Sequence, residues 1–150
     1  MSMICYMDTP IGVLQIECRE DVLYSVKVVS DFDGMKSFKD NFIVKQLNEY
    51  FAGERKTFNV NKRLLGTPFQ LKVWQALEEI PYGETLTYKQ IAEKIGQPKS
   101  VRAVGGAIHK NPIAIIVPCH RVIGSNGKMI GYAYGVEKKS WLLYMESSLK

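Results

Sequence analysis

Two helix-start signals in succession constrain the fold of this chain more than any other feature. The run Thr67-Pro68-Phe69-Gln70 places a capping threonine, a proline at the first helical position and a glutamine at the third. The run Thr87-Tyr88-Lys89-Gln90 repeats the spacing of threonine and glutamine. Because Pro81-Tyr82-Gly83 forms a turn between them, the sequence predicts two short helices joined by a tight connection.

A third helix is predicted from about Lys99 to His109, after a stop at Gly96. Short helices joined by a glycine-containing turn are typical of a helix-turn-helix, although an ordinary helical hairpin gives the same pattern. Arg102 lies among small residues, two of them glycines that are poor helix formers. Small side chains allow close approach of another backbone, from which one arginine could project. Tight packing inside the protein is the competing interpretation.

The segment after Asn111-Pro112 carries further strand and turn signals. Ile113–Val117 is a short apolar strand candidate, and Asn126-Gly127 between apolar pairs predicts a hairpin that would resemble a wing. A last helix is expected from Val136 to Glu146, with Trp141, Leu142 and Met145 on its apolar side.

The first part of the chain has strand periodicity instead. We expect strands at Met3–Met7, Val13–Cys18 and Val22–Val29, then a helix with an apolar face that ends at Gly53. That face contains Phe42, Ile43, Leu47, Tyr50 and Phe51. The predicted fold class is α/β (α+β), with a strand and helix domain at 1–60, a linker at 61–66, and a winged helix-turn-helix-like domain at 67–150.

The composition limits the class of protein. With 46% hydrophobic and 23% charged residues, the chain can bury a core and is not expected to be disordered. It has no apolar run of about 18 residues and no signal-peptide pattern, so we expect no membrane partner and assign the protein to the cytoplasm or nucleus, with the cytoplasm preferred. The odd number of cysteines argues against a secreted disulfide framework.

Basic residues gather in one part of the chain. Residues 81–139 hold nine of the lysines and arginines but only three glutamates, whereas the whole chain has a net charge of +5. Such asymmetry favours a polyanionic partner, although solvated surface charge can give the same pattern.

Cys119 is a candidate nucleophile, because His120 is next to it and Arg121 follows, although a cysteine–histidine pair alone is more often a coincidence. A thiol attacks as thiolate and therefore needs a base or positive surroundings. Neighbours on a strand point to opposite faces, so a bend at Pro118 would be needed to bring the imidazole alongside. Cys5 and Cys18 are interpreted as small buried hydrophobic residues, and we expect no metal.

The run Pro118-Cys119-His120-Arg121-Val122 closely resembles the active-site signature of the O6-alkylguanine-DNA alkyltransferases, also called methylated-DNA–protein-cysteine methyltransferases. The resemblance extends in the same order over about residues 67–147, which makes it far more specific than one short motif. It includes residues 81–83, 87–88, 102–107, 111–112 and 139–146.

This resemblance implies a direct damage-reversal reaction. An alkyl group on O6 of guanine, and also on O4 of thymine, would pass irreversibly to Cys119 in a single turnover. His120 would activate the thiol through a water, Glu146 would orient His120, Asn111 would hold the active-site turn, and Tyr88 would assist nucleotide rotation and the departing guanine.

The resemblance also implies a DNA surface and a base pocket in a monomeric protein that binds double-stranded DNA containing O6-alkylguanine. Arg102 would enter the duplex from a helix lying in the minor groove. The expected DNA-binding residues are Arg102, Ala103, Gly105, Gly106 and Arg121. The expected pocket residues are Val122, Tyr132, Ala133, Tyr134 and Lys139. Relatives often have a small residue where this chain has Tyr134, so a narrower range of adducts is expected here.

Two alternatives come from other classes of protein. A winged helix-turn-helix regulator could use Cys119 as an alkylation or redox sensor, but it would not need Asn111, Tyr88 and Glu146 together. A cysteine hydrolase would be expected to release its product and turn over.

Overall fold

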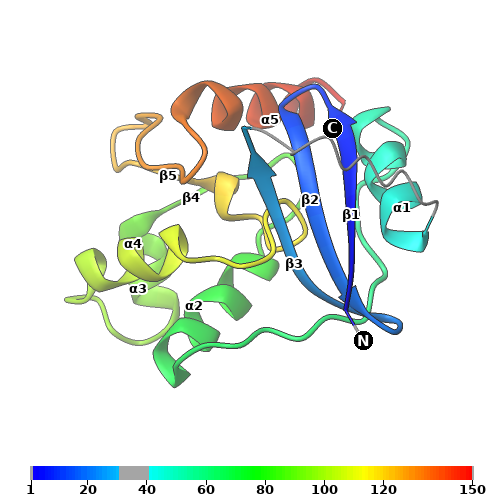
Figure 1. Cartoon of the computed structure of the whole chain (residues 1–150). Helices are drawn as coiled ribbons and strands as arrows, with labels where there is room; N and C mark the ends of the chain where they lie inside the picture. Colours follow the sequence, from blue (N-terminus) through cyan, green and yellow to red (C-terminus); the bar gives the residue numbers. More distant parts are fainter. Residues whose placement is uncertain (1, 31–40, 150) are drawn as a thin grey trace. The chain divides into compact units, whose positions relative to one another are not determined.

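The computed structural model describes residues 2–30 and 41–149 (Figure 1). The chain divides into two compact units, Met1–Leu64 with Pro112–Ala114, and Leu65–Asn111 with Ile115–Lys150. No helix among the described residues is long and apolar enough to cross a bilayer. The mixed α/β class predicted from the sequence is confirmed.

Unit 1 is built on an antiparallel sheet of three strands in the order β1-β2-β3. The strands are β1 (Ser2–Thr9), β2 (Gly12–Arg19) and β3 (Val22–Val29), so all three predicted strands are confirmed. Along β2 the buried Leu14, Ile16 and Cys18 alternate with more exposed neighbours, because successive side chains of a strand point to opposite faces.

The helix α1 (Phe42–Phe51) completes unit 1, as the sequence predicted. Its N-terminus is capped by Asn41, whose Oδ1 accepts a 2.8 Å hydrogen bond from the Val44 N–H. Ile43, Leu47 and Tyr50 are buried, whereas Phe42 is 39% exposed. The apolar face of α1 is therefore narrower than the predicted one.

Part of the predicted linker belongs to unit 1. Lys62 forms a parallel bridge with Leu23, whose backbone N–H and carbonyl bond to Asn61 and Arg63 at 2.8 and 2.9 Å. The segment 61–63 is thus held along the edge of β3 by main-chain hydrogen bonds, which leave little trace in a polar sequence.

The prediction of a strand at Ile113–Val117 is wrong. Ile113 makes only an isolated bridge to Val26, and Ile115 adopts a left-handed conformation with φ of 72°. An apolar run alone does not distinguish a strand from buried irregular chain. The left-handed residue ends the extended stretch before Pro118, and the chain turns there instead.

Unit 2 contains the helices with the predicted capping signals. These are α2 (Pro68–Glu78) and α3 (Tyr88–Lys94), each with a complete capping box. The third predicted helix is α4 (Val101–His109), and the last is α5 (Val136–Ser148). The indole N–H of buried Trp74 on α2 donates a 2.8 Å hydrogen bond to the Ala107 carbonyl, which joins α2 to α4.

The predicted wing hairpin does not form as two paired strands. Its first arm, β5 (Val122–Ile123), pairs in parallel with β4 (Leu86–Thr87). The turn itself is present, since Gly127 has φ of +74° and its N–H donates to the Gly124 carbonyl at 2.9 Å. On α5, Leu142 and Met145 are buried as predicted, but Trp141 is 37% exposed.

Candidate active site

A single turn of 3₁₀ helix, η1 (Cys119–Arg121), presents the candidate nucleophile. The Arg121 N–H closes the turn by donating to the Pro118 carbonyl at 3.0 Å. All three residues of η1 are buried. A 3₁₀ turn has three residues per turn, so neighbours are not forced to opposite faces as they are on a strand.

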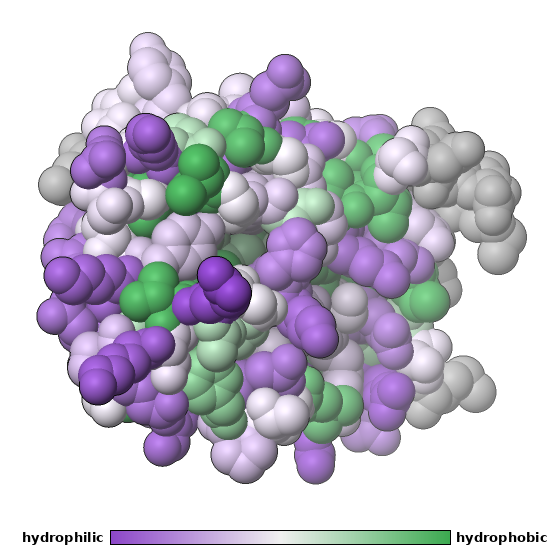
Figure 2. Space-filling view, turned by 90° about the vertical axis from the view of Figure 1, so that its left-hand side faces the viewer, coloured by the Kyte–Doolittle hydropathy of each residue, from purple (hydrophilic) through white to green (hydrophobic). Residues whose placement is uncertain are grey.

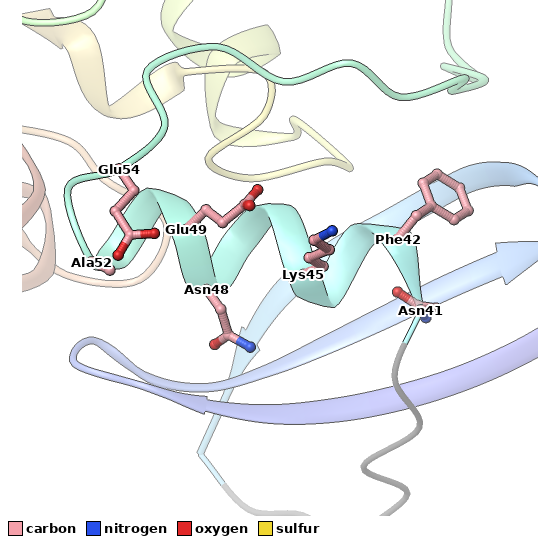
Figure 3. Close-up of a pocket in the computed structure, with 7 residues that line it drawn as sticks. All are labelled: Asn41, Phe42, Lys45, Asn48, Glu49, Ala52 and Glu54. Carbon is pink, nitrogen blue, oxygen red and sulfur yellow. The ribbon is translucent and has the colours of Figure 1, made fainter.

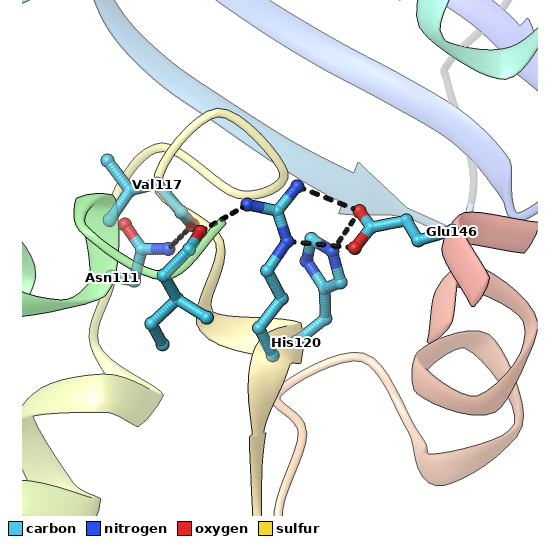
Figure 4. A network of polar contacts seen from close by, with 6 residues as sticks. Asn111, Val117, His120 and Glu146 are labelled. Carbon is cyan, nitrogen blue, oxygen red and sulfur yellow. Dashed lines mark hydrogen bonds and ion pairs between the residues drawn. The ribbon is translucent and has the colours of Figure 1, made fainter. Parts of the chain in front are cut away.

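Asn111 holds the approach to this turn. Its Nδ2 donates a 2.8 Å hydrogen bond to the Val117 carbonyl, two residues before the nucleophile (Figure 4). A further hydrogen bond from the Asn111 side chain lowers the pKa of the Cys119 thiol. Asn111 can therefore support both the backbone and the charge of this site.

Behind the turn, a buried cluster joins η1 to α5 (Figure 4). His120 Nε2 lies 2.7 Å from Glu146 Oε2. Arg121 forms a fork on the same carboxylate, with Nε donating to Oε1 at 2.8 Å and Nη2 donating to Oε2 at 3.0 Å. Such paired, charge-assisted contacts are the strong form of an arginine–carboxylate interaction.

The cluster sets the protonation states. Burial raises the pKa of Glu146, but the hydrogen bonds from His120 and Arg121 and the charge of Arg121 act in the opposite direction and hold this pKa well below its usual range. Burial lowers the pKa of His120, although Glu146 opposes this change. At neutral pH we therefore expect an ionised Glu146 and a neutral His120.

The tautomer of His120 follows from its partner. A carboxylate only accepts hydrogen bonds, so Nε2 carries the proton and Nδ1 has the free lone pair. His120 Nδ1 is buried and has no hydrogen-bond partner among the residues that the structure describes. This nitrogen can accept a proton, directly or through one water.

Cys119 needs such a base. Burial raises the pKa of its thiol to about 11, while the Asn111 hydrogen bond and the charge of Lys139 act in the opposite direction. The resting group is therefore a neutral thiol, which is a weak nucleophile until its proton is removed.

The loop before α5 is held by two polar side chains. Lys139 Nζ donates to the Ile130 carbonyl at 2.8 Å, and the Tyr88 hydroxyl lies 3.1 and 2.9 Å from the carbonyls of Ile130 and Gly131. Gly131 has φ of +67°, and a Cβ at this position would lie 2.8 Å from the Tyr88 hydroxyl. The positive φ favours glycine here, and a Cβ would force the Tyr88 hydroxyl to move.

Lys139 also acts on the charge of the site. Burial lowers its pKa to about 8, and the nearby Cys119 opposes this change. A lysine that stays protonated near neutral pH would favour the thiolate of Cys119.

Three of the predicted pocket residues belong to this loop, whereas Val122 lies on β5 and Lys139 on α5. Val122 and Tyr132 are buried, Tyr134 is half-buried, and Ala133 is exposed. The rings of Tyr132 and Tyr134 meet edge to face with centroids 5.6 Å apart. Three of the predicted pocket residues therefore form one continuous segment that follows Gly131.

Most small residues of α4 lie at or near the surface, although Ala107 is buried. Arg102, Ala103 and Gly106 are exposed. Figure 2 shows the molecule from the side on which α3 and α4 lie in Figure 1, and hydrophilic residues cover much of this face. A Cβ on Gly106 would meet nothing within 4 Å among the described residues, and one on Gly105 would lie 4.0 Å from the Tyr88 ring. Tight internal packing does not explain these glycines, whereas close approach of an external partner would.

The prediction that Arg121 contacts DNA is corrected by the structure. Its side chain is only 8% exposed and is fully engaged, because Nη1 also donates to the Ile80 carbonyl at 2.7 Å. A buried guanidinium with these partners is not available to phosphates. A basic residue in a reactive-site motif carries no sequence signal for burial.

Several functional groups escaped the sequence analysis because they are backbone atoms. The carbonyls of Ile80, Ile130 and Gly131 accept the hydrogen bonds that fix Arg121, Lys139 and Tyr88. Main-chain acceptors are the same for every residue type. The only available signal was the glycine at 131.

A cavity of about 710 Å³ lies on unit 1, along α1 (Figure 3). The described residues that line it are Asn41, Phe42, Lys45, Asn48, Glu49, Ala52 and Glu54. None of these described residues is a cysteine or a histidine.

Comparison with known proteins agrees with this geometry. Residues 68–148 match the family model "6-O-methylguanine DNA methyltransferase, DNA binding domain", and residues 4–64 match its "ribonuclease-like domain". A methylated-DNA–protein-cysteine methyltransferase of Methanosarcina acetivorans is 62% identical over an alignment that covers 94% of this chain and 96% of the relative.

Solved structures are similar along the whole chain. The O6-methylguanine methyltransferase of Mycobacterium tuberculosis has a TM-score of 0.90 and 44% identity, over 100% of this chain and 95% of that one. The OGT protein of the same organism in complex with DNA has a TM-score of 0.89 and 46% identity, over 97% and 93%. This chain belongs to the methylated-DNA–protein-cysteine methyltransferase family.

Proposed function

We propose that this protein repairs alkylated DNA by moving an alkyl group from O6 of guanine, and from O4 of thymine, to Cys119. The observation that carries the proposal is the buried arrangement of Cys119, His120 and Glu146, in which His120 Nδ1 has no hydrogen-bond partner among the described residues. Family membership supports the same activity. The direct test is transfer of a labelled methyl group from an O6-methylguanine duplex to the protein.

The chemistry needs only groups that the chain and its substrate supply. His120 removes the thiol proton through a water, and the sulfur attacks the alkyl carbon. A C–S bond forms, the C–O6 bond breaks with its electron pair left on guanine, and the departing base takes up one proton. The resulting thioether has no chemical route of reversal within the site, so each molecule acts once and needs no cofactor.

The exposed face of α4 is the proposed contact with double-stranded DNA. O6 of guanine is enclosed in the base stack, so the nucleotide must rotate out of the duplex before transfer. The small residues Ala103, Gly105 and Gly106 permit close approach to the minor groove, and Arg102 can occupy the space left by the base.

Arg102→Ala should lower the rate of repair in duplex DNA by about 10- to 100-fold, because unstacking costs a few kcal/mol that the arginine helps to offset. Transfer from the free base O6-methylguanine should change little, since a free base requires no extrusion. Single-turnover rates on both substrates check this. Lys110→Ala, which removes an exposed charge just after the same helix, is the control, and equal losses on both substrates would point to a structural role for Arg102.

Tyr134→Ser should widen the range of adducts. The half-buried ring of Tyr134 packs against Tyr132, and forcing a large group into a filled site costs about 1–3 kcal/mol. Transfer from free O6-benzylguanine should therefore rise roughly tenfold or more, with methyl transfer nearly unchanged. Tyr144→Ser is the matched control, because Tyr144 is 76% exposed on α5. An unchanged benzyl rate would remove Tyr134 from the selection of adducts.

The regulator alternative is not favoured. A sensor needs a reactive thiol and a DNA-binding surface, but it has no use for an ionised carboxylate that fixes the tautomer of a buried histidine. The DNA-bound state of the Mycobacterium tuberculosis relative supports DNA as the partner here.

We assign the protein to the cytoplasm and expect it to be a monomer. Its three cysteines are all free thiols, which agrees with a reducing compartment.

A further inference from the structure

Arg121 makes three side-chain hydrogen bonds in the candidate site, yet the proposed reaction gives it no part. Its Nε and Nη2 donate to the two oxygens of Glu146, and its Nη1 donates to the Ile80 carbonyl. Burying a guanidinium costs free energy that good geometry must offset. These three contacts satisfy that requirement and leave the group rigid.

The first consequence concerns the orientation of Glu146. Both carboxylate oxygens accept from Arg121, so the plane of the carboxylate is fixed by a fork that a single bond from His120 could not provide. Oε2 then receives His120 Nε2 at 2.7 Å. The ring of His120 is held with Nδ1 on the side away from the carboxylate.

The second consequence concerns charge. Several titratable or charged groups surround His120. They are Glu146 and Lys139 on α5 and Cys119 and Arg121 on η1. The Tyr82 ring is also part of these surroundings, with its centroid 5.7 Å from the Arg121 guanidinium. Burial is the largest influence that lowers the pKa of His120, Glu146 raises it, and Arg121 and Lys139 lower it. Without Arg121, the charge of Glu146 would be less compensated and would favour the imidazolium of His120 more strongly.

We propose that Arg121 is a positioning residue of the alkyl transfer, which keeps Glu146 an oriented ionised acceptor and His120 a neutral base, and thereby sets the lower end of the pH range in which transfer works. This inference rests on the proposed function. A base must be neutral before it can take the thiol proton. Arg121 extends that condition to lower pH, because its charge disfavours a second buried cation beside it.

The test is the pH dependence of single-turnover methyl transfer by the wild-type protein, Arg121→Gln and Arg121→Lys. The acid limb of the rate profile should move to higher pH by about one unit in Arg121→Gln. It should move less in Arg121→Lys, which keeps a charge but loses the fork. Lys72→Gln, which removes an exposed charge from α2 of the same unit, should leave the profile in place.

A purely structural role would lower the rate by the same factor at every pH. The proposal is overturned by such a uniform loss, by an unmoved limb, or by a shift to lower pH, which would indicate that a thiolate–imidazolium pair is the reactive form. If the wild-type protein itself transfers no methyl group, the proposed function fails instead, so the two failures are distinguishable.

A measurement on the unchanged protein remains decisive if both variants fail to fold. The chain has only two histidines, and His109→Gln assigns their signals in a nitrogen-detected NMR titration. We expect His120 to be neutral at pH 7, with its proton on Nε2. We also expect it to take up a second proton only at a lower pH than an ordinary histidine does. A protonated His120 at neutral pH, or a proton on Nδ1, overturns the inference.

Discussion

Replacing Cys119 by serine should abolish alkyl transfer, with a residual rate at least about 10⁴-fold below that of the wild-type protein. A serine hydroxyl has a far higher pKa than a thiol, so His120 cannot generate its anion to a useful extent. The site is built around sulfur, since Asn111 and Lys139 both stabilise the thiolate of Cys119. Transfer of a radiolabelled methyl group from an O6-methylguanine duplex measures the loss.

The same experiment on the wild-type protein gives the stoichiometry. One protein molecule should repair one lesion, and the peptide that contains Cys119 should gain about 14 Da, the mass of one methylene group. Cys5 and Cys18 are buried in the sheet of unit 1 and serve as internal controls. Label on either of them, or several turnovers by a homogeneous sample, would contradict the proposed mechanism.

Glu146→Gln and His120→Ala should each slow transfer by about 10²-fold or more, the usual contribution of general acid–base catalysis. Loss of His120 removes the base. The amide introduced by Glu146→Gln would leave the fork of Arg121 incomplete and would no longer require a proton on His120 Nε2, so the lone pair of Nδ1 would not be assured. Affinity for undamaged duplex DNA should stay nearly unchanged, because both side chains are fully buried.

The two losses should not add. Residues that act as one unit lose the same function whichever of them is removed, so the double variant should be little slower than the slower single variant. Single-turnover rates of the three variants measure the coupling, and circular dichroism melting controls for partial unfolding of a buried cluster. Full additivity, or a silent Glu146→Gln, would exclude Glu146 from the activation of Cys119.

The sequence by itself determined the local elements whose signals are local. The threonine caps at positions 67 and 87 predicted α2 and α3, and alternation predicted the three strands of unit 1. These patterns succeed because a cap or a period of two depends on nearby residues only. The resemblance of residues 67–147 to a known family then identified Cys119, on grounds that no single helix or strand supplies.

Only the tertiary structure decided which groups meet across long stretches of chain. β5 pairs with the distant β4 and not with its own hairpin arm, and Ile115 interrupts an apolar run that looks like a strand. Arg121 shows the reason most clearly: its sequence neighbours suggest a DNA contact, whereas its partners are Glu146 and the Ile80 carbonyl. Burial and hydrogen-bond satisfaction depend on the packing of remote segments, so a sequence can name the side chain without naming what it binds.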